Sequence, residues 1–180
     1  LIAVSAHGAD IDGKSMAGAA YLFRMESNGS ITHLAKVTAP DGAAGDKFAH
    51  SSISLDGNLL AVGVRFSDPN GNTDAGATYL YQVETNGSVT FLQKVIAPDG
   101  ATGDNFGRSV SQSVNLLVVG AHESDLDGTT GAGATYLYRK EANGSVTFLQ
   151  KVIAPDGAAS DKFGVSVSQS GHFLAVGIDS

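Results

Sequence analysis

The hydrophobic and polar positions of this chain follow the patterns of β-strands, and the stretch that starts at Phe106 shows them in order. Phe106–Ser113 alternates small and apolar side chains, Leu116–Ala121 is a continuous apolar run, and Ala132–Glu141 and Ser145–Ala154 alternate again. Alternation is typical of a strand with one buried face, and a short continuous run is typical of a strand buried on both faces. No segment of ten or more residues carries an apolar stripe at helical spacing. The pattern predicts four strands in a row and an all-β protein.

This four-strand pattern recurs at a fixed period. Val37–Gly42 returns as Val95–Gly100 and as Val152–Gly157, so the prolines of the three copies are 58 and 57 residues apart. A period of this size indicates a tandem array. The single segment 1–180 therefore divides into repeats of approximately 1–58, 59–115 and 116–172, and a fourth begins at 173–180. The first two copies are one residue further apart than the second and third. We expect the extra residue, Ser51 or Ser52, to form a bulge inside a strand.

An Asn-Gly pair separates the third and fourth strands of every repeat, at Asn28, Asn86 and Asn143. Asn-Gly is a strong hairpin signal because both residues tolerate positive φ. Repeated units of four antiparallel strands predict the blades of a β-propeller, in which strand 1 lines the central channel and strand 4 faces outward. A β-sandwich is the competing architecture, but it would not need near-identical copies at so long a period. The Asn-Gly-Ser triplets also satisfy the N-glycosylation pattern, although the turn alone explains them.

Composition and charge exclude several classes of function. The chain has 42% apolar residues and 23 glycines, which suits an ordered protein with a core. Its formal net charge of −7 has the wrong sign for wrapping nucleic acid, and no apolar run reaches the length of about 20 residues that a membrane helix needs. The absence of cysteine excludes disulfides and thiolate metal sites. Because the chain starts inside a strand pattern without an initiator methionine, we expect it to be a window from a longer protein.

Two paired motifs resemble a known family. Phe106-Gly107 is followed by Leu117–Ala121, and Phe163-Gly164 is followed by Leu174–Gly177. These motifs resemble FG-GAP repeats, the blades of the integrin α-subunit head and of many bacterial surface proteins. The resemblance extends over essentially the whole chain. It implies a propeller, usually of seven blades, of which about three lie here, in a bacterial protein that is secreted or exposed on the cell surface.

The chain departs from the family pattern at several positions. The first copy has Phe48-Ala49 in place of Phe-Gly, and the proline of the GAP element is replaced by His7, Arg65, His122 and Asp179. The calcium loop of the family, a D-x-D-x-D-G run between strands 1 and 2, is absent because these connections are too short to hold it.

Long loops gather most carboxylates on one face of the predicted blades. In an up-and-down blade the connections between strands 2 and 3 and between strands 4 and 1 lie at the same end. We call this end, made of residues 7–17, 41–47, 65–75, 99–105, 122–132 and 156–162, the acidic loop face. Since loops on a rigid scaffold commonly carry function, we expect it to bind a protein or glycan partner. The candidate contact residues are His7, Arg65, His122, Asp41, Asp46, Asp99, Asp104, Asp156 and Asp161. His7 and His122 could contact an anionic ligand or bond to a nearby backbone group or Asp.

The loops between strands 2 and 3 have alternating oxygen-bearing side chains around a glycine. Such side chains suit Ca²⁺, which takes six to eight oxygen ligands in irregular geometry. The candidate ligands are Asp10, Asp12, Asp68, Asn70, Asn72, Asp74, Asp125 and Asp127. The alternative interpretation is that Asp, Asn and Gly are simply good turn formers.

No catalytic motif accompanies these loops. His50 precedes Ser51, but no G-x-S-x-G element is present and the other copies lack the pair. The tyrosines two residues apart on strand 3 are best interpreted as packing between blades. We therefore expect a non-catalytic extracellular module for recognition, adhesion or structure. The alternatives are a carbohydrate-binding propeller and an accessory domain of a larger secreted enzyme, and the unfinished sheets at the two ends could support self-assembly.

Overall fold

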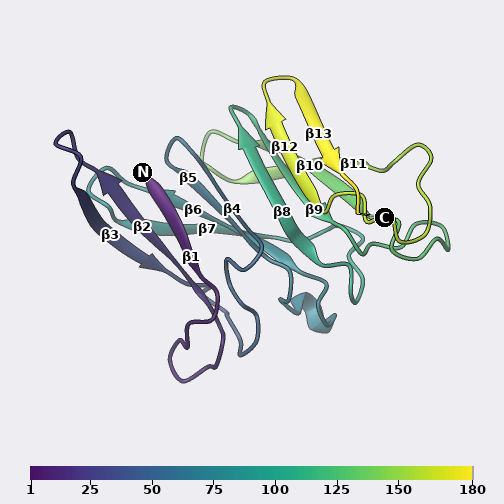
Figure 1. Cartoon of the computed structure of the whole chain (residues 1–180), viewed down its shortest axis with the longest axis horizontal. Helices are drawn as coiled ribbons and strands as arrows, with labels where there is room; N and C mark the ends of the chain where they lie inside the picture. The colour runs from purple at the N-terminus through teal and green to yellow at the C-terminus, as the bar shows by residue number, and fades with distance from the viewer. Residues whose placement is uncertain (180) are drawn as a thin grey trace.

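The computed structural model describes residues 1–179, and the regular structure in this part is almost entirely β (Figure 1). Its strands are β1 (Ile2–Ala6), β2 (Ala19–Met25), β3 (Ile31–Val37), β4 (Ser52–Asp56), β5 (Leu59–Val64), β6 (Ala77–Val83), β7 (Val89–Val95), β8 (Phe106–Ser113), β9 (Leu116–Ala121), β10 (Ala134–Lys140), β11 (Val146–Val152), β12 (Ser166–Ser170) and β13 (Phe173–Gly177). A 3₁₀ turn, η1 (Pro69–Gly71), lies between β5 and β6. No helix within residues 1–179 is long and apolar enough to cross a lipid bilayer.

The strands form antiparallel up-and-down sheets, as the sequence predicts. Two sheets have four strands each, in the orders β4-β5-β6-β7 and β8-β9-β10-β11. They are flanked by the three-stranded sheet β1-β2-β3 and the two-stranded sheet β12-β13. The described residues therefore hold two complete propeller-type blades and parts of two others. Sequence repeat and blade differ in phase, because the repeat 59–115 contains three strands of one blade and β8, the first strand of the next.

The first strands of successive blades lie side by side. The backbone N–H of Val110 in β8 donates a 2.9 Å hydrogen bond to the hydroxyl of Ser52 in β4. In the same way, the N–H of Gln169 in β12 donates to the hydroxyl of Ser111 at 3.0 Å. Serine side chains thus link neighbouring blades along their first strands.

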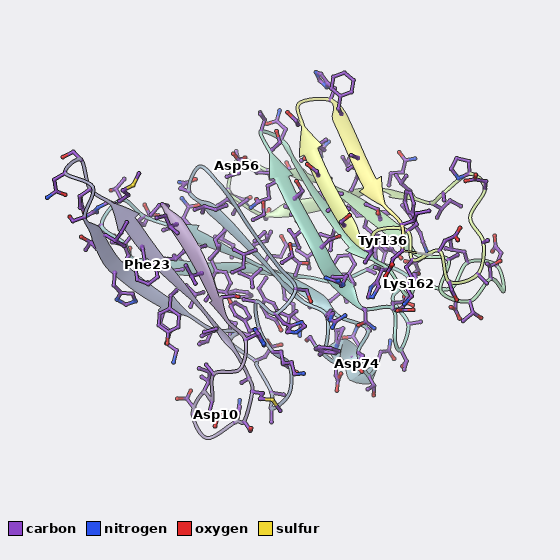
Figure 2. All side chains as sticks on the ribbon, viewed as in Figure 1. Asp10, Phe23, Asp56, Asp74, Tyr136 and Lys162 are labelled. Carbon is purple, nitrogen blue, oxygen red and sulfur yellow. The ribbon has the colours of Figure 1, made fainter. Side chains whose placement is uncertain are left out.

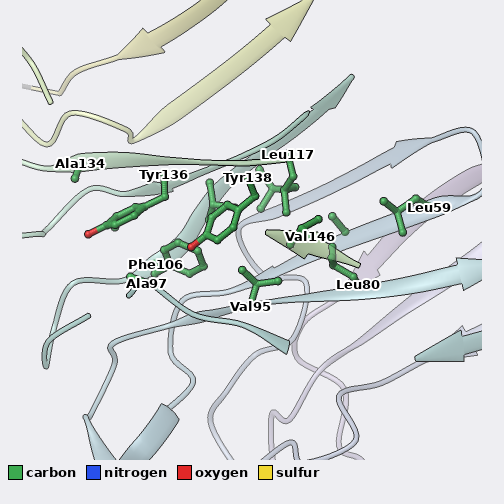
Figure 3. Close-up of a cluster of buried hydrophobic side chains, with 14 residues drawn as sticks. Leu59, Leu80, Val95, Ala97, Phe106, Leu117, Ala134, Tyr136, Tyr138 and Val146 are labelled. Carbon is green, nitrogen blue, oxygen red and sulfur yellow. The ribbon is translucent and has the colours of Figure 1, made fainter. Parts of the chain in front are cut away.

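The second strands form the centre of the core. All six residues of β5 are buried, as are five of the six residues of β9. The ring of Phe106 packs edge-on against Tyr136 and Tyr138 of its own blade, with centroids 5.5 and 6.2 Å apart, and this group packs against Leu80 and Val95 of the preceding blade (Figure 3). Phe48 packs in the same way on the equivalent tyrosines of the preceding blade junction. The interpretation of the tyrosine pairs as packing between blades is confirmed.

The Asn-Gly turns form where they were predicted, but the two residues have different roles. Only glycine takes positive φ, with values of 83°, 88° and 81° at Gly29, Gly87 and Gly144. The amide oxygen of Asn28 accepts a 3.0 Å hydrogen bond from the N–H of Ser30, and the other two turns repeat this contact. The asparagine therefore closes the turn with its side chain.

The predicted bulge at Ser51 or Ser52 is wrong. β4 pairs with β5 from Ser52 to Asp56 without any shift of register. The N–H of His50 donates to the carbonyl of Lys47 at 2.8 Å, and Arg108 and Val165 make the same contact in the other copies, so the extra residue follows this turn, at Ser51 just before β4. Spacing in the sequence cannot distinguish an insertion in a ladder from one in the adjoining turn.

Two glycines allow adjacent blades to approach closely. A Cβ atom on Gly63 in β5 would collide with the carbonyl of Gly107 in β8. Gly107 itself has φ of +90°, which L side chains rarely adopt. This contact places the end of one second strand directly against the start of the next first strand.

Candidate functional site

At one end of the blades, the long loops between strands 2 and 3 are hydrogen-bonded to the segments that connect one blade to the next. The N–H of Phe48 donates to the carbonyl of Ala17 at 2.8 Å. In the same way, the N–H groups of Phe106 and Phe163 donate to the carbonyls of Ala75 and Ala132, both at 2.9 Å. Figure 2 shows Asp10 and Asp74 at this end and Asp56 at the opposite end. The acidic loop face is therefore a set of loops held together by backbone hydrogen bonds.

Asp41 and Asp99 connect neighbouring blades. Oδ1 of Asp41 accepts a 2.7 Å hydrogen bond from the hydroxyl of Tyr79, and its Oδ2 lies 2.8 Å from Nζ of Lys94. Partial burial alone would raise the pKa of Asp41, but the hydrogen bonds from Lys94 and Tyr79 outweigh it, so the pKa is lowered. Asp99 makes the same pair of contacts in the next blade. Both carboxylates were expected to face a partner, whereas in the structure they hold a tyrosine and a lysine of the following blade.

Asp156 occupies the same position in the third copy of the motif but has a different environment. It is exposed, and its carboxylate makes no hydrogen bond or ion pair with any residue in 1–179. The tyrosine and lysine that bind Asp41 and Asp99 lie 37 to 53 residues further along the chain, whereas the sequence extends 24 residues past Asp156.

Asp46, Asp104 and Asp161 close their own loops. Each accepts a hydrogen bond from the backbone N–H three residues earlier, at 2.8, 2.9 and 2.7 Å. Asp46 and Asp104 are buried, and this burial raises the pKa of both side chains. These three carboxylates support the loops from inside, and the two buried ones are poorly placed to meet a partner.

The first aspartate of every loop between strands 2 and 3 also accepts a backbone hydrogen bond. Asp10, Asp68 and Asp125 each bind the N–H six residues later, at 2.9, 2.8 and 2.8 Å. Asp12 and Asp127 take positive φ, and their side chains are exposed. Three His, Asp or Glu side chains do not meet anywhere in residues 1–179 in an arrangement that could hold a metal ion.

The middle loop has the largest number of candidate oxygen ligands. Asn72 uses its amide to donate a 3.2 Å hydrogen bond to the carbonyl of Gly100. Asn70 and Asp74 take positive φ, with values of 57° and 52°. Turn formation therefore accounts for the geometry of these residues.

The three basic candidates lie at the inner ends of their loops, directly after a second strand. The ring of His7 packs edge-on against His50 at 4.6 Å, and the guanidinium of Arg65 lies 4.4 Å from the ring centre of Phe66. His122 is only 6% exposed, and its Nε2 lies 3.4 Å from Glu123. Burial lowers the pKa of His122 to about 4.

Other basic side chains join these three, and the sequence interpretation missed their association. We call the group formed by Lys47, His50, Arg65, Arg108, His122 and His7 the basic cluster. His50 and Arg108 occupy equivalent positions, two residues after Phe48 and Phe106. This equivalence is the feature of the sequence that could have predicted their association.

The pair of His50 and Ser51 does not form a catalytic triad. His50 Nδ1 lies 3.2 Å from the Ser51 hydroxyl. Burial lowers the pKa of His50, and the positive charge of Arg65 lowers it further. No Asp or Glu in residues 1–179 forms an ion pair with this imidazole, so the acid that orients a catalytic histidine is missing.

Comparison with known families agrees with the repeat structure. The FG-GAP repeat family matches the chain in three segments, residues 31–81, 89–138 and 146–178. No curated protein matches the chain. Repeats of this family are typically non-catalytic modules. Because the three matched segments span most of its length, the chain belongs to the FG-GAP repeat family.

Proposed function

We propose that the chain is a non-catalytic recognition module of a secreted or surface-exposed protein and binds a protein partner through the acidic loop face. One observation carries this proposal: backbone hydrogen bonds between neighbouring loops, such as that from Asn105 to Asp74 at 3.0 Å, hold this face in a fixed shape. A binding surface that is ordered in advance loses less conformational entropy when a partner binds.

Several carboxylates remain available on this fixed surface. The side chains of Asp12, Asp74 and Asp127 accept no hydrogen bond from residues 1–179, and Asp12 and Asp127 are exposed. Their negative charge would attract a basic partner and increase its rate of association. Asp41 and Asp99 contribute to this surface indirectly, because they fix the blades that carry it.

Binding of the purified chain to a panel of purified matrix and cell-surface proteins, measured by biolayer interferometry, tests this proposal. The variant Asp12→Asn/Asp74→Asn/Asp127→Asn should lose at least about tenfold in affinity for a bound protein. The control Asp56→Asn/Glu84→Gln/Glu141→Gln removes the same charge from the opposite end and should bind like wild type. Equal loss in both variants would show a general charge effect and contradict the proposal.

We propose Ca²⁺ as a ligand of the middle loop, because the Asp68–Asp74 stretch offers the most side-chain oxygens. Calcium should then raise the melting temperature, and EDTA should reverse the rise. Melting that is unchanged by both reagents contradicts a calcium site. The variant Asp74→Asn, which keeps a side chain that tolerates positive φ, should lose the calcium effect without unfolding.

The carbohydrate alternative has less support. The hollow between the second and third blades on this face is lined by Asp99, Thr102, Glu123, Asp125 and Lys151 among others, and no aromatic ring lines it. Sugar-binding sites commonly use an aromatic face for stacking. A glycan array would decide the point, since a strong and specific hit would favour this alternative.

We also propose that another repeat of the same kind can dock at the ends of this chain. Lys36 Nζ lies 5.9 Å from the ring centre of Tyr21, much as Lys94 does over Tyr79. Asp156 presents the matching carboxylate at the other end. Sedimentation velocity should show concentration-dependent association that Asp156→Asn with Lys36→Gln weakens. A monomer at all concentrations contradicts this docking.

A further inference from the structure

The basic cluster is built by the same junction at successive blades. At each junction the end of a second strand lies close to the start of the next first strand. His7 meets His50 in this way, with ring centres 4.6 Å apart. The close approach of Gly63 to Gly107 brings together the chain segments that carry Arg65 and Arg108. His122 occupies the equivalent place at the third junction.

The positive charges of the cluster have few counter-charges. Lys47, Arg65 and Arg108 form no ion pair within 4.0 Å among residues 1–179. Glu123 and Asp74 are the acids whose charge acts on Arg65, and Glu123 already lies 3.3 Å from Lys162 and 3.4 Å from His122. The cluster therefore carries a local excess of positive charge in a chain whose formal net charge is −7.

Several nitrogen atoms in the cluster are buried without any acceptor. Nε of Arg65 and Nε of Arg108 have no hydrogen-bond partner in the described part of the chain. The same is true of Nδ1 of His122, a side chain that is more than nine-tenths buried. An unsatisfied buried polar group costs about 1–3 kcal/mol, and more when it is charged. One ligand with several acceptor atoms could relieve all three nitrogens.

Aromatic contacts fix part of the cluster in place. Phe66 lies under both the Arg65 guanidinium, at 4.4 Å, and Nζ of Lys47, at 5.1 Å. Cations held against a ring keep their orientation and lose less freedom on binding. The cluster is thus partly organised before any ligand arrives.

We propose that the basic cluster binds an oxyanion group, namely sulfate, phosphate or carboxylate, between Arg65 and Arg108 at the inner edge of the acidic loop face. The planar fork of arginine matches such groups with two parallel hydrogen bonds. Lys47 and the histidines would supply further donors. The anion would bind nitrogen atoms of Arg65 and Arg108, whereas the proposed protein contact uses carboxylates, so different variants test the two proposals.

The test is isothermal titration of the intact chain with sodium sulfate, phosphate or citrate, against sodium chloride of equal ionic strength. We expect a dissociation constant of about 1 mM or below and a raised melting temperature. The sulfate, phosphate and citrate arms show whether the site prefers a tetrahedral anion or a carboxylate.

Two matched variants make the result specific. Arg65→Gln/Arg108→Gln should lose binding at least about tenfold. Arg24→Gln/Arg139→Gln removes the same charge from two exposed arginines that pair with Glu26 and Glu141, and it should bind like wild type. If the first variant fails to fold, Lys47→Gln replaces it and should also weaken binding. Absence of binding, or equal binding by both double variants, overturns the proposal.

Discussion

The hydroxyl of Tyr136 in β10 donates a 2.7 Å hydrogen bond to Oδ1 of Asp99, which belongs to the connection leaving the preceding blade. Asp99 also binds Lys151 at 2.7 Å. The tyrosine is fully buried, while the lysine and the carboxylate are partly exposed. The hydrogen bond from the buried hydroxyl should therefore contribute more stability than the ion pair, because surface pairs are weak.

The substitution Asp99→Ala should lower the free energy of unfolding by about 1–3 kcal/mol, because it leaves the buried Tyr136 hydroxyl without an acceptor. Urea unfolding followed by circular dichroism measures the change. Asp156→Ala is the matched control, since it alters the same motif in the copy whose carboxylate is free. A similar loss in both variants would mean that the aspartate stabilises its own turn and does not join the blades.

Gly63→Ala should destabilise the protein by about 3 kcal/mol or more, because the new methyl group would collide with the backbone of Gly107. Gly8→Ala is the control, as no atom lies within 4 Å of its ideal Cβ position and its φ is not positive. Thermal melting of the two variants gives the comparison. A Gly63→Ala protein that melts like wild type would show that the blades can separate locally at little cost.

Acidification should destabilise the fold through His122. Its pKa is about 4 in the folded chain and 6.5 as the unperturbed value, so the unfolded chain binds its proton first as the pH falls. The contribution of His122 to the free energy of unfolding is thus fully present above pH 6.5, and it is lost as the pH falls from 6.5 to 4. The loss is at most about 3.5 kcal/mol, from about 1.4 kcal/mol for each pKa unit.

Urea titrations at several pH values test this slope. His122→Gln should flatten it between pH 6.5 and 4. His172→Gln, at an exposed turn on the opposite end, should leave it unchanged. Asp46 and Asp104, whose pKa values burial raises, oppose the trend at the acidic end, because the folded state takes up their protons more readily. An unchanged slope in His122→Gln would contradict the assignment.

Local pattern was sufficient to predict the strands. The ranges expected from alternation and from the apolar run, Phe106–Ser113 and Leu116–Ala121, are the bounds of β8 and β9. Strand periodicity is a property of neighbouring residues, and the repeat supplied independent copies of the same signal. The four-stranded sheets and the loops at each end of them followed from these strands.

The roles of the side chains could not be predicted in the same way. Asp99 binds Tyr136, which lies 37 residues later and in the next blade, so the sequence around Asp99 does not reveal this contact. The segments that carry Arg65 and Arg108 come from different blades and approach each other where Gly63 lies against Gly107. Whether a carboxylate binds its own loop, as Asp104 does, depends on backbone angles that composition does not reveal.

The offset between repeat and blade has a consequence for how such an array can evolve. β8 closes one sequence repeat and opens the next sheet, so a gain or loss of one whole period leaves every strand with a partner, wherever the exchange begins. The identical stretches Asn86–Ala101 and Asn143–Ala158 are natural points for unequal recombination. A chain with one period more or fewer would therefore keep the same order of strands within each sheet.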